Sequence, residues 1–157
     1  MNIVDFIRNI FNKLKYNYSI LFNMDIASIL IHCESDKIYK FMLDRQKINL
    51  WSFGIHWDVQ EGDEIMKGIS NFDQSISFLK ITKNDKLKQI NYWIGKDIDN
   101  LIPRINVRIM LTDDINKNQL LMISLKTNDM NSERWNKLKE LHNLEVKKIK
   151  ELIENKI

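Results

Sequence analysis

The chain has 157 residues, which is enough for one domain with a hydrophobic core and short for two. Apolar residues make up 44% and charged residues 29% of the sequence, as in ordinary globular proteins. No apolar run approaches the ~20 residues that span a bilayer, and the first residues lack a secretory cleavage site. Cys33 is the only cysteine, which excludes an internal disulfide, and we expect a cytoplasmic protein with no membrane contact.

Glycine and proline are scarce, with four glycines and one proline in the chain. Sites that cradle phosphates or dinucleotides need closely spaced glycines, because the backbone must approach the ligand. The glycines here are scattered outside any such motif: Gly54, Gly62, Gly68 and Gly95. The sequence therefore argues against nucleotide-dependent catalysis, and we expect neither a cofactor nor a bound metal.

Charge is unevenly distributed, although the formal net charge is only +3. Residues 58–73 are mainly acidic, whereas residues 80–108 are mainly basic. An acidic and a basic segment in one small domain predict a surface that carries patches of both signs.

The first third of the chain is predicted to contain a helix and a hairpin. Residues 3–14 repeat apolar side chains at helical spacing, which predicts an amphipathic helix that packs on a sheet. Residues 26–33 form an apolar run typical of a buried strand. Residues 38–44 follow a polar turn and are interpreted as the second strand of the hairpin.

The segment LWSFGIHWDVQEGDE, residues 50–64, places large apolar side chains at odd positions from Trp51 to Val59. Successive side chains of a strand point to opposite faces, so this alternation predicts one strand with its aromatic rings in the core. The opposite face would carry His56 and Asp58 side by side.

The later segments complete the predicted fold. Residues 60–74 are interpreted as a connector with a short helix near 64–69, and residues 75–82 as a strand. Apolar spacing over 85–101 predicts a middle helix, capped by Asp85 and ended by Pro103. Residues 105–111 and 120–127 alternate as a second hairpin, and residues 132–157 predict a long C-terminal helix.

These elements predict the α+β class for a single domain over residues 1–157. Strands joined by short turns pair antiparallel, so we expect a mainly antiparallel sheet of about five to six strands, built from hairpins in a meander. The N-terminal, middle and long C-terminal helices would pack on one face of that sheet.

His56 and Asp58 are the first candidate site for chemistry. A carboxylate beside an imidazole can raise its basicity, as a general base requires, and Glu61, Asp63 and Glu64 follow as candidate metal ligands. This pattern supports a small metal-dependent hydrolase as one alternative. The opposing interpretation is an exposed strand face followed by an acidic loop, and we favour it because no further ligands are evident.

Two further segments contain candidate functional residues. His142 and Glu145 lie three residues apart on the predicted last helix and can share a face, but the second histidine of a metalloprotease HExxH motif is absent. Four lysines precede Tyr92 and Trp93, and such a segment can bind phosphates while the rings stack on bases. The lysines that would form this nucleic-acid-binding segment are Lys80, Lys83, Lys86 and Lys88.

The absence of a nucleophile motif or a cofactor cradle favours a non-catalytic protein-binding module. The acidic residues Asp58, Glu61, Asp63 and Glu64, next to His56, could occupy the phosphate-binding surface of a basic nuclease. The leading hypothesis is therefore an immunity- or antitoxin-type inhibitor of a cognate basic toxin, acting as a monomer or homodimer. Nucleic-acid binding through the four lysines is the alternative, and the hydrolase is the third hypothesis.

Overall fold

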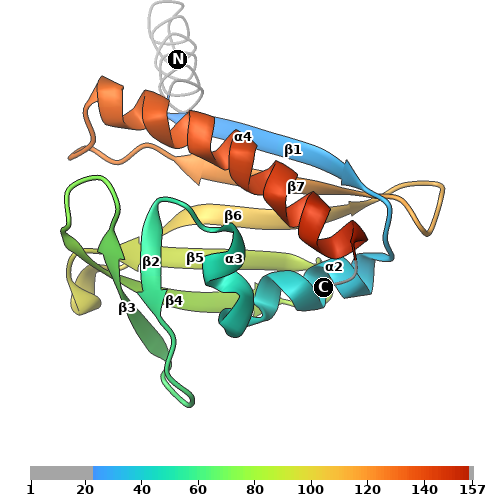
Figure 1. The fold of residues 1–157 in the computed structure, drawn as a ribbon, viewed down its shortest axis with the longest axis horizontal. Coiled ribbons are helices and arrows are strands. Elements are labelled where there is room, and N and C mark those ends of the chain that lie inside the picture. Colours follow the sequence, from blue (N-terminus) through green and yellow to red (C-terminus); the bar gives the residue numbers. More distant parts are fainter. Residues whose placement is uncertain (1–22, 156–157) are drawn as a thin grey trace, which may run out of the picture.

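The computed structural model describes residues 23–155, which form one antiparallel sheet with helices packed on one of its faces (Figure 1). The strands are β1 (Met24–Ile31), β2 (Ile55–Asp58), β3 (Ile65–Ser70), β4 (Ile76–Asn84), β5 (Gln89–Gly95), β6 (Ile102–Leu111) and β7 (Asn118–Leu125). The α-helices are α2 (Ser35–Leu43), α3 (Ile48–Trp51) and α4 (Ser132–Glu154), and short 3-10 turns occupy Arg45–Lys47 and Ile98–Asn100.

The sheet is an open meander to which the first strand is added at one edge. Strands β2 to β7 are neighbours in chain order, and β1 pairs with β7, which gives the order β1-β7-β6-β5-β4-β3-β2. All six pairings are antiparallel. The edges of the sheet are therefore β1 and β2, and α2 with α3 carries the chain from one edge to the other.

The long helix α4 lies across the sheet on the same face as α2 and α3 (Figure 1). Its first turn is capped by Asn131, whose side-chain oxygen accepts a hydrogen bond from the backbone N–H of Arg134 at 2.8 Å. Apolar side chains at helical spacing, including Val146 and Ile149, are buried against the sheet. The main core therefore lies between α4, the shorter helices and the inner face of the sheet.

The structure confirms the α+β class and several predicted elements. The strand predicted at 75–82 is β4, the hairpin at 105–111 and 120–127 is β6 with β7, and the long last helix is α4. The sheet has seven strands, which is more than the five to six expected. The helix predicted at residues 3–14 lies outside the described residues.

The hairpin predicted for residues 26–33 and 38–44 is wrong, because the second segment is helix α2. Its buried residues include Ile38, Phe41 and Met42, which follow the three- and four-residue spacing of a helix face. Strand β1 instead pairs with β7.

The middle helix predicted over 85–101 is also wrong. Residues 85–88 form a turn in which Lys88 has a positive φ of 44°, and β5 follows. Ile90, Tyr92 and Ile94 are buried at every second position of that strand. Two residues four apart satisfy both a helical and a strand period, so Ile90 and Ile94 alone could not distinguish the two structures.

The strand predicted from Trp51 to Val59 is shorter than its alternation suggested. Trp51 ends α3, residues 52–54 are irregular, and β2 begins at Ile55. Trp51 and Trp57 are both buried as predicted, whereas Phe53 is 37% exposed. The short helix expected near 64–69 is strand β3.

Among the helices of residues 23–155, none combines the length and apolar character needed to cross a membrane.

Candidate functional site

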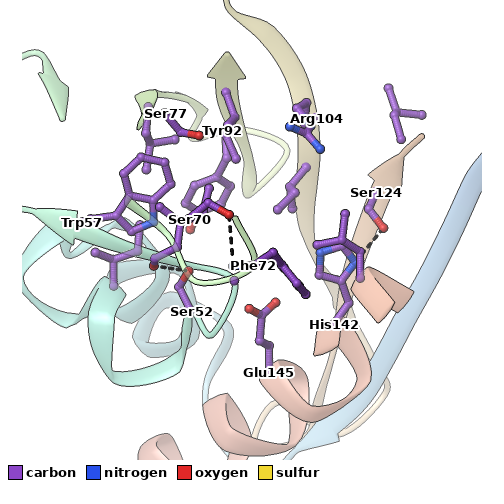
Figure 2. Close-up of a pocket in the computed structure, with 18 of the residues that line it drawn as sticks. Ser52, Trp57, Ser70, Phe72, Ser77, Tyr92, Arg104, Ser124, His142 and Glu145 are labelled. Carbon is purple, nitrogen blue, oxygen red and sulfur yellow. Dashed lines mark hydrogen bonds between the residues drawn. The ribbon is translucent and has the colours of Figure 1, made fainter. Parts of the chain in front are cut away.

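A cavity opens between the first half of α4 and the inner face of the sheet, and it is the candidate site (Figure 2). It contains about 770 Å³ of empty space, counting the part that is open to solvent. Its aromatic walls come from α3, β2, the β3–β4 turn, β5 and α4. These side chains are Trp51, Trp57, Phe72, Tyr92 and Trp135.

The aromatic walls are held by specific contacts. The Trp51 and Tyr92 rings meet edge to face with their centroids 5.9 Å apart. The Tyr92 hydroxyl donates a hydrogen bond to the backbone oxygen of Met42 at 2.7 Å. The Asn49 side-chain oxygen accepts a hydrogen bond from the backbone N–H of Trp57 at 2.8 Å, and the Asn49 side-chain nitrogen donates one to the backbone oxygen of Trp57 at 2.7 Å. These contacts fix α3, β2 and β5 as a preformed wall.

Gly68 allows Trp57 to lie directly against β3. A Cβ atom at Gly68 would be 2.5 Å from Trp57 Cε3 and 2.9 Å from the backbone oxygen of His56. Both distances are shorter than any normal carbon contact, so only glycine fits at this position without a shift of β2.

Glu145 is the buried acid of the cavity. Its side chain points from α4 into the space beneath Phe72 (Figure 2), and the residue is 4% exposed. Glu145 Oε1 accepts a hydrogen bond from the backbone N–H of Phe53 at 2.8 Å. Burial raises the pKa of Glu145 to about 7, although hydrogen bonds from the Phe53 and Gly54 backbone act in the opposite direction. The carboxyl group can therefore donate or accept a proton near neutral pH.

His142 lies one turn earlier on the same face of α4, as its spacing from Glu145 allowed. Its Nδ1 is 2.9 Å from the Ser124 hydroxyl oxygen of β7 (Figure 2). Burial lowers the pKa of His142 to about 4, and the positive charge of Arg104 contributes to the same shift. The imidazole is therefore neutral at pH 7.

Arg104 reaches the cavity because of an irregularity in β6. Tyr92 of β5 pairs with Ile105 and the next residue, Trp93, pairs with Pro103, so Arg104 is an extra residue in the ladder. Such a bulge redirects a side chain, and proline is tolerated in a strand at such places. Burial lowers the pKa of the Arg104 guanidinium, the charge of Asp129 opposes that shift, and the group still carries its charge at neutral pH.

Two polar atoms of the cavity walls have no hydrogen-bond partner within the described part of the chain. Trp51 Nε1 and Arg134 Nε are buried without a hydrogen bond to any residue between 23 and 155. Arg134 is otherwise held by Asp73, at 2.9 Å between Nη1 and Oδ2, and its guanidinium lies over the Phe72 ring. Buried donors without partners are uncommon in folded proteins, and they indicate a place where a ligand or water binds.

The predicted acidic site lies elsewhere, on the far edge of the sheet. His56 and Asp58 occupy exposed positions of β2 on the face opposite to Trp57, as predicted, and neither lines the cavity. Glu61 and Asp63 are exposed in the β2–β3 turn, where the backbone oxygens of Asp63 and Glu64 accept hydrogen bonds from Arg45. Within residues 23–155, His, Cys, Asp and Glu side chains form no cluster of three or more that suits a metal ion.

The predicted basic segment is divided between β4 and the β4–β5 turn. Lys80 contacts Glu64 at 2.5 Å, because the pairing of β3 with β4 brings the acidic and basic segments together. Lys83 pairs with Asp85 at 3.0 Å, and Lys88 pairs with Asp36. Lys86 is exposed in the turn. Protein binding through the acidic segment and nucleic-acid binding through the lysines both stay predictions.

Sequence reasoning missed Arg104 and the role of the two polar residues on α4. His142 and Glu145 continue the apolar stripe that runs through Trp135 and Leu138, so their positions indicated burial. The signal for Arg104 was Pro103, because a proline inside a strand pattern indicates a bulge or an edge.

Comparison with known proteins shows the fold alone. The sequence matches no family model, and no curated protein matches it. XoxI from Bacillus cereus has a similar architecture, with a TM-score of 0.62 and 12% identity over 83% of this chain and 95% of that one. The aromatase/cyclase Zhui from Streptomyces sp. R1128 has a TM-score of 0.61 and 11% identity over 84% of this chain and 93% of that one. Aha1 from Colwellia psychrerythraea, solved as a dimer, has a TM-score of 0.60 and 14% identity over 83% of this chain and 96% of that one. A curved antiparallel sheet that holds a long C-terminal helix defines this helix-grip-like fold.

Proposed function

We propose that the protein binds a small, mainly apolar molecule in the cavity between α4 and the sheet. The observation that carries this proposal is an aromatic-walled space within the fold that also contains unpaired buried polar groups. A space that served only packing would be filled by side chains, because cavities cost stability. Small-molecule sites combine apolar walls with a few convergent polar groups, and this cavity has both.

The residues that line the cavity also support small-molecule binding. Trp51 and Trp57 are buried in the core as expected, with Ile55 packed against it, and all three side chains also line the cavity. One protein of the same fold is an aromatase/cyclase, which is compatible with a chemical role for a cavity in this architecture. Glu145, with a pKa of about 7, is the group that would transfer a proton in such a role.

Inhibition of a basic toxin remains a second proposal, based on the exposed acidic turn. The contacts of Glu64 with Lys80 and of Arg45 with the turn backbone reduce the negative charge that this surface presents. Reversing the charges of Glu61, Asp63 and Glu64 would weaken binding to a basic partner, and unchanged affinity would contradict the assignment.

The cavity proposal is tested with N-phenyl-1-naphthylamine, a neutral dye whose fluorescence rises in apolar surroundings. Saturable binding to the wild-type protein is expected. Ser77→Leu adds volume to the inner face of β4, where Ser77 lines the cavity, and should weaken binding at least tenfold. Ser28→Leu makes the same change at an exposed position of β1 and should leave binding unchanged. Equal binding by both variants would place the dye on the outer surface and contradict the proposal.

A further inference from the structure

Resting on the proposed function, we propose that Arg104 is a carboxylate receptor and that the cavity selects apolar carboxylic acids over neutral molecules of the same shape.

The β6 ladder places Arg104 where regular pairing would not. Val107 and Ile109 are buried on the inner face, whereas Arg108, between them, is exposed on the outer face. Neighbouring residues of a regular strand point to opposite faces, but Arg104 and Ile105 both line the cavity. This is possible because Arg104 is the extra residue of the bulge between Pro103 and Ile105. Bulges occur beside binding sites because they re-aim a side chain, and this one directs a permanent positive charge inward.

The guanidinium of Arg104 has no partner among the residues that the structure describes. Between residues 23 and 155 it makes no ion pair within 4.0 Å, while Arg134 is paired with Asp73. Asp129 is close enough to influence Arg104 electrostatically, and both residues line a second pocket. Arg104 is half-buried, and a partly desolvated charge without a hydrogen-bonded partner is costly, so an oxyanion in the cavity would stabilise it.

The other groups of the cavity restrict the charge of that oxyanion. His142 is neutral and hydrogen-bonded to Ser124, so it adds no second positive charge. Glu145 faces the same space and would repel a doubly charged group. One unpaired arginine fits a single negative charge, and its planar fork matches the two oxygens of a carboxylate. The aromatic walls accommodate an apolar body behind this head group.

The test measures displacement of N-phenyl-1-naphthylamine at pH 7.5 by 2-naphthoate and by its methyl ester. The pair differs in charge but keeps the ring and the carbonyl. Wild-type protein should bind the acid at least tenfold more tightly than the ester, because a hydrogen bond between two charged groups is roughly twice as strong as one to a neutral carbonyl. Arg104→Gln should abolish that preference by weakening the acid while leaving the ester and the dye unchanged.

Arg108→Gln provides the matched control on the same strand. Arg108 is exposed on the outer face and donates to Gln89 at 3.0 Å, so its loss should change neither affinity. Should Arg104→Gln fail to fold, Arg104→Lys keeps the charge without the planar fork and should reduce acid binding severalfold.

The outcomes separate the two proposals. Equal affinity for acid and ester, or an acid preference that survives in Arg104→Gln or is undiminished in Arg104→Lys, would overturn the carboxylate assignment and leave the cavity function intact. Failure of the dye to bind wild-type protein would overturn both.

Discussion

Charged side chains form ion pairs on the outer face of the sheet, whereas Glu145 and Arg104 in the cavity form none with residues 23–155. On the outer face charged side chains contact each other, as Lys80 does with Glu64. In the cavity, Glu145 accepts only backbone hydrogen bonds, and Arg104 has no partner within the described residues. Exposed ion pairs add little to stability, whereas unpaired buried groups cost free energy. The cavity is therefore where a functional reason for the polar residues must be sought.

The largest expected effect is on the pH dependence of stability, to which the buried Glu145 contributes through its raised pKa. The pKa of Glu145 is raised from 4.5 to about 7, so folding favours its protonated form and stability falls as the pH rises through that window. Glu145→Gln removes this loss. Relative to wild type, the variant should gain about 3 kcal/mol between pH 4.5 and pH 8, measured by urea unfolding at each pH. A constant difference between the two proteins would contradict the buried acid.

His142 should make stability depend on pH in the opposite direction. Its pKa is lowered from 6.5 to about 4, so folding favours the neutral ring and stability is lost as the pH falls from 6.5 toward 4. His142→Asn keeps a polar atom near Ser124 without a titrating ring. Relative to wild type it should gain about 3 kcal/mol between pH 7 and pH 4 in the same unfolding measurement. A variant that loses ground in acid would refute this assignment.

Gly68 tests how tightly the cavity wall is built. Gly68→Ala forces a Cβ against Trp57 and the His56 backbone, and should lower the free energy of unfolding by about 2 kcal/mol. Dye affinity should fall as well, because Trp57 must move. Lys67→Ala changes the neighbouring exposed position of β3 and serves as the control. If Gly68→Ala were as stable as that control, the close packing of β2 on β3 would be wrong.

The smallest effect is expected on the charged surface. Lys80→Ala removes the contact with Glu64, and the melting temperature should change by no more than about 2 °C, because exposed pairs contribute little. Raising the salt concentration should reduce that change further. A shift of many degrees would show that the surface network supports the fold and would weaken the contrast between the two faces.

The C-terminal half of the fold could be predicted from sequence, whereas the segments around the cavity could not. In β6, β7 and α4 one periodicity dominates over many residues, so their types were recognised. In α2 and β5 the apolar residues fit both periods over a short stretch, and tertiary pairing decided between them. Segment 85–101 illustrates the failure: it forms β5 because β4 and β6 lie on either side.

The candidate site was harder to predict because its residues come from separate elements. Arg104, His142 and Glu145 converge only when β6 and α4 pack together, and a single sequence shows no convergence. His56 and Asp58 were conspicuous because they are neighbours in the chain, and their exposed position on β2 follows correctly from the alternation. Closeness in the sequence therefore did not identify the residues that line the cavity.

The pairing of β1 with β7 has a consequence for how the protein is made. Met24 aligns with Leu125, so the first described strand must wait for almost the whole chain to leave the ribosome before its partner exists. Contacts between such distant segments slow folding and leave a strand edge exposed in the meantime. Truncation before β7 should consequently yield aggregated protein, and a binding-competent cavity can arise only after synthesis has reached α4.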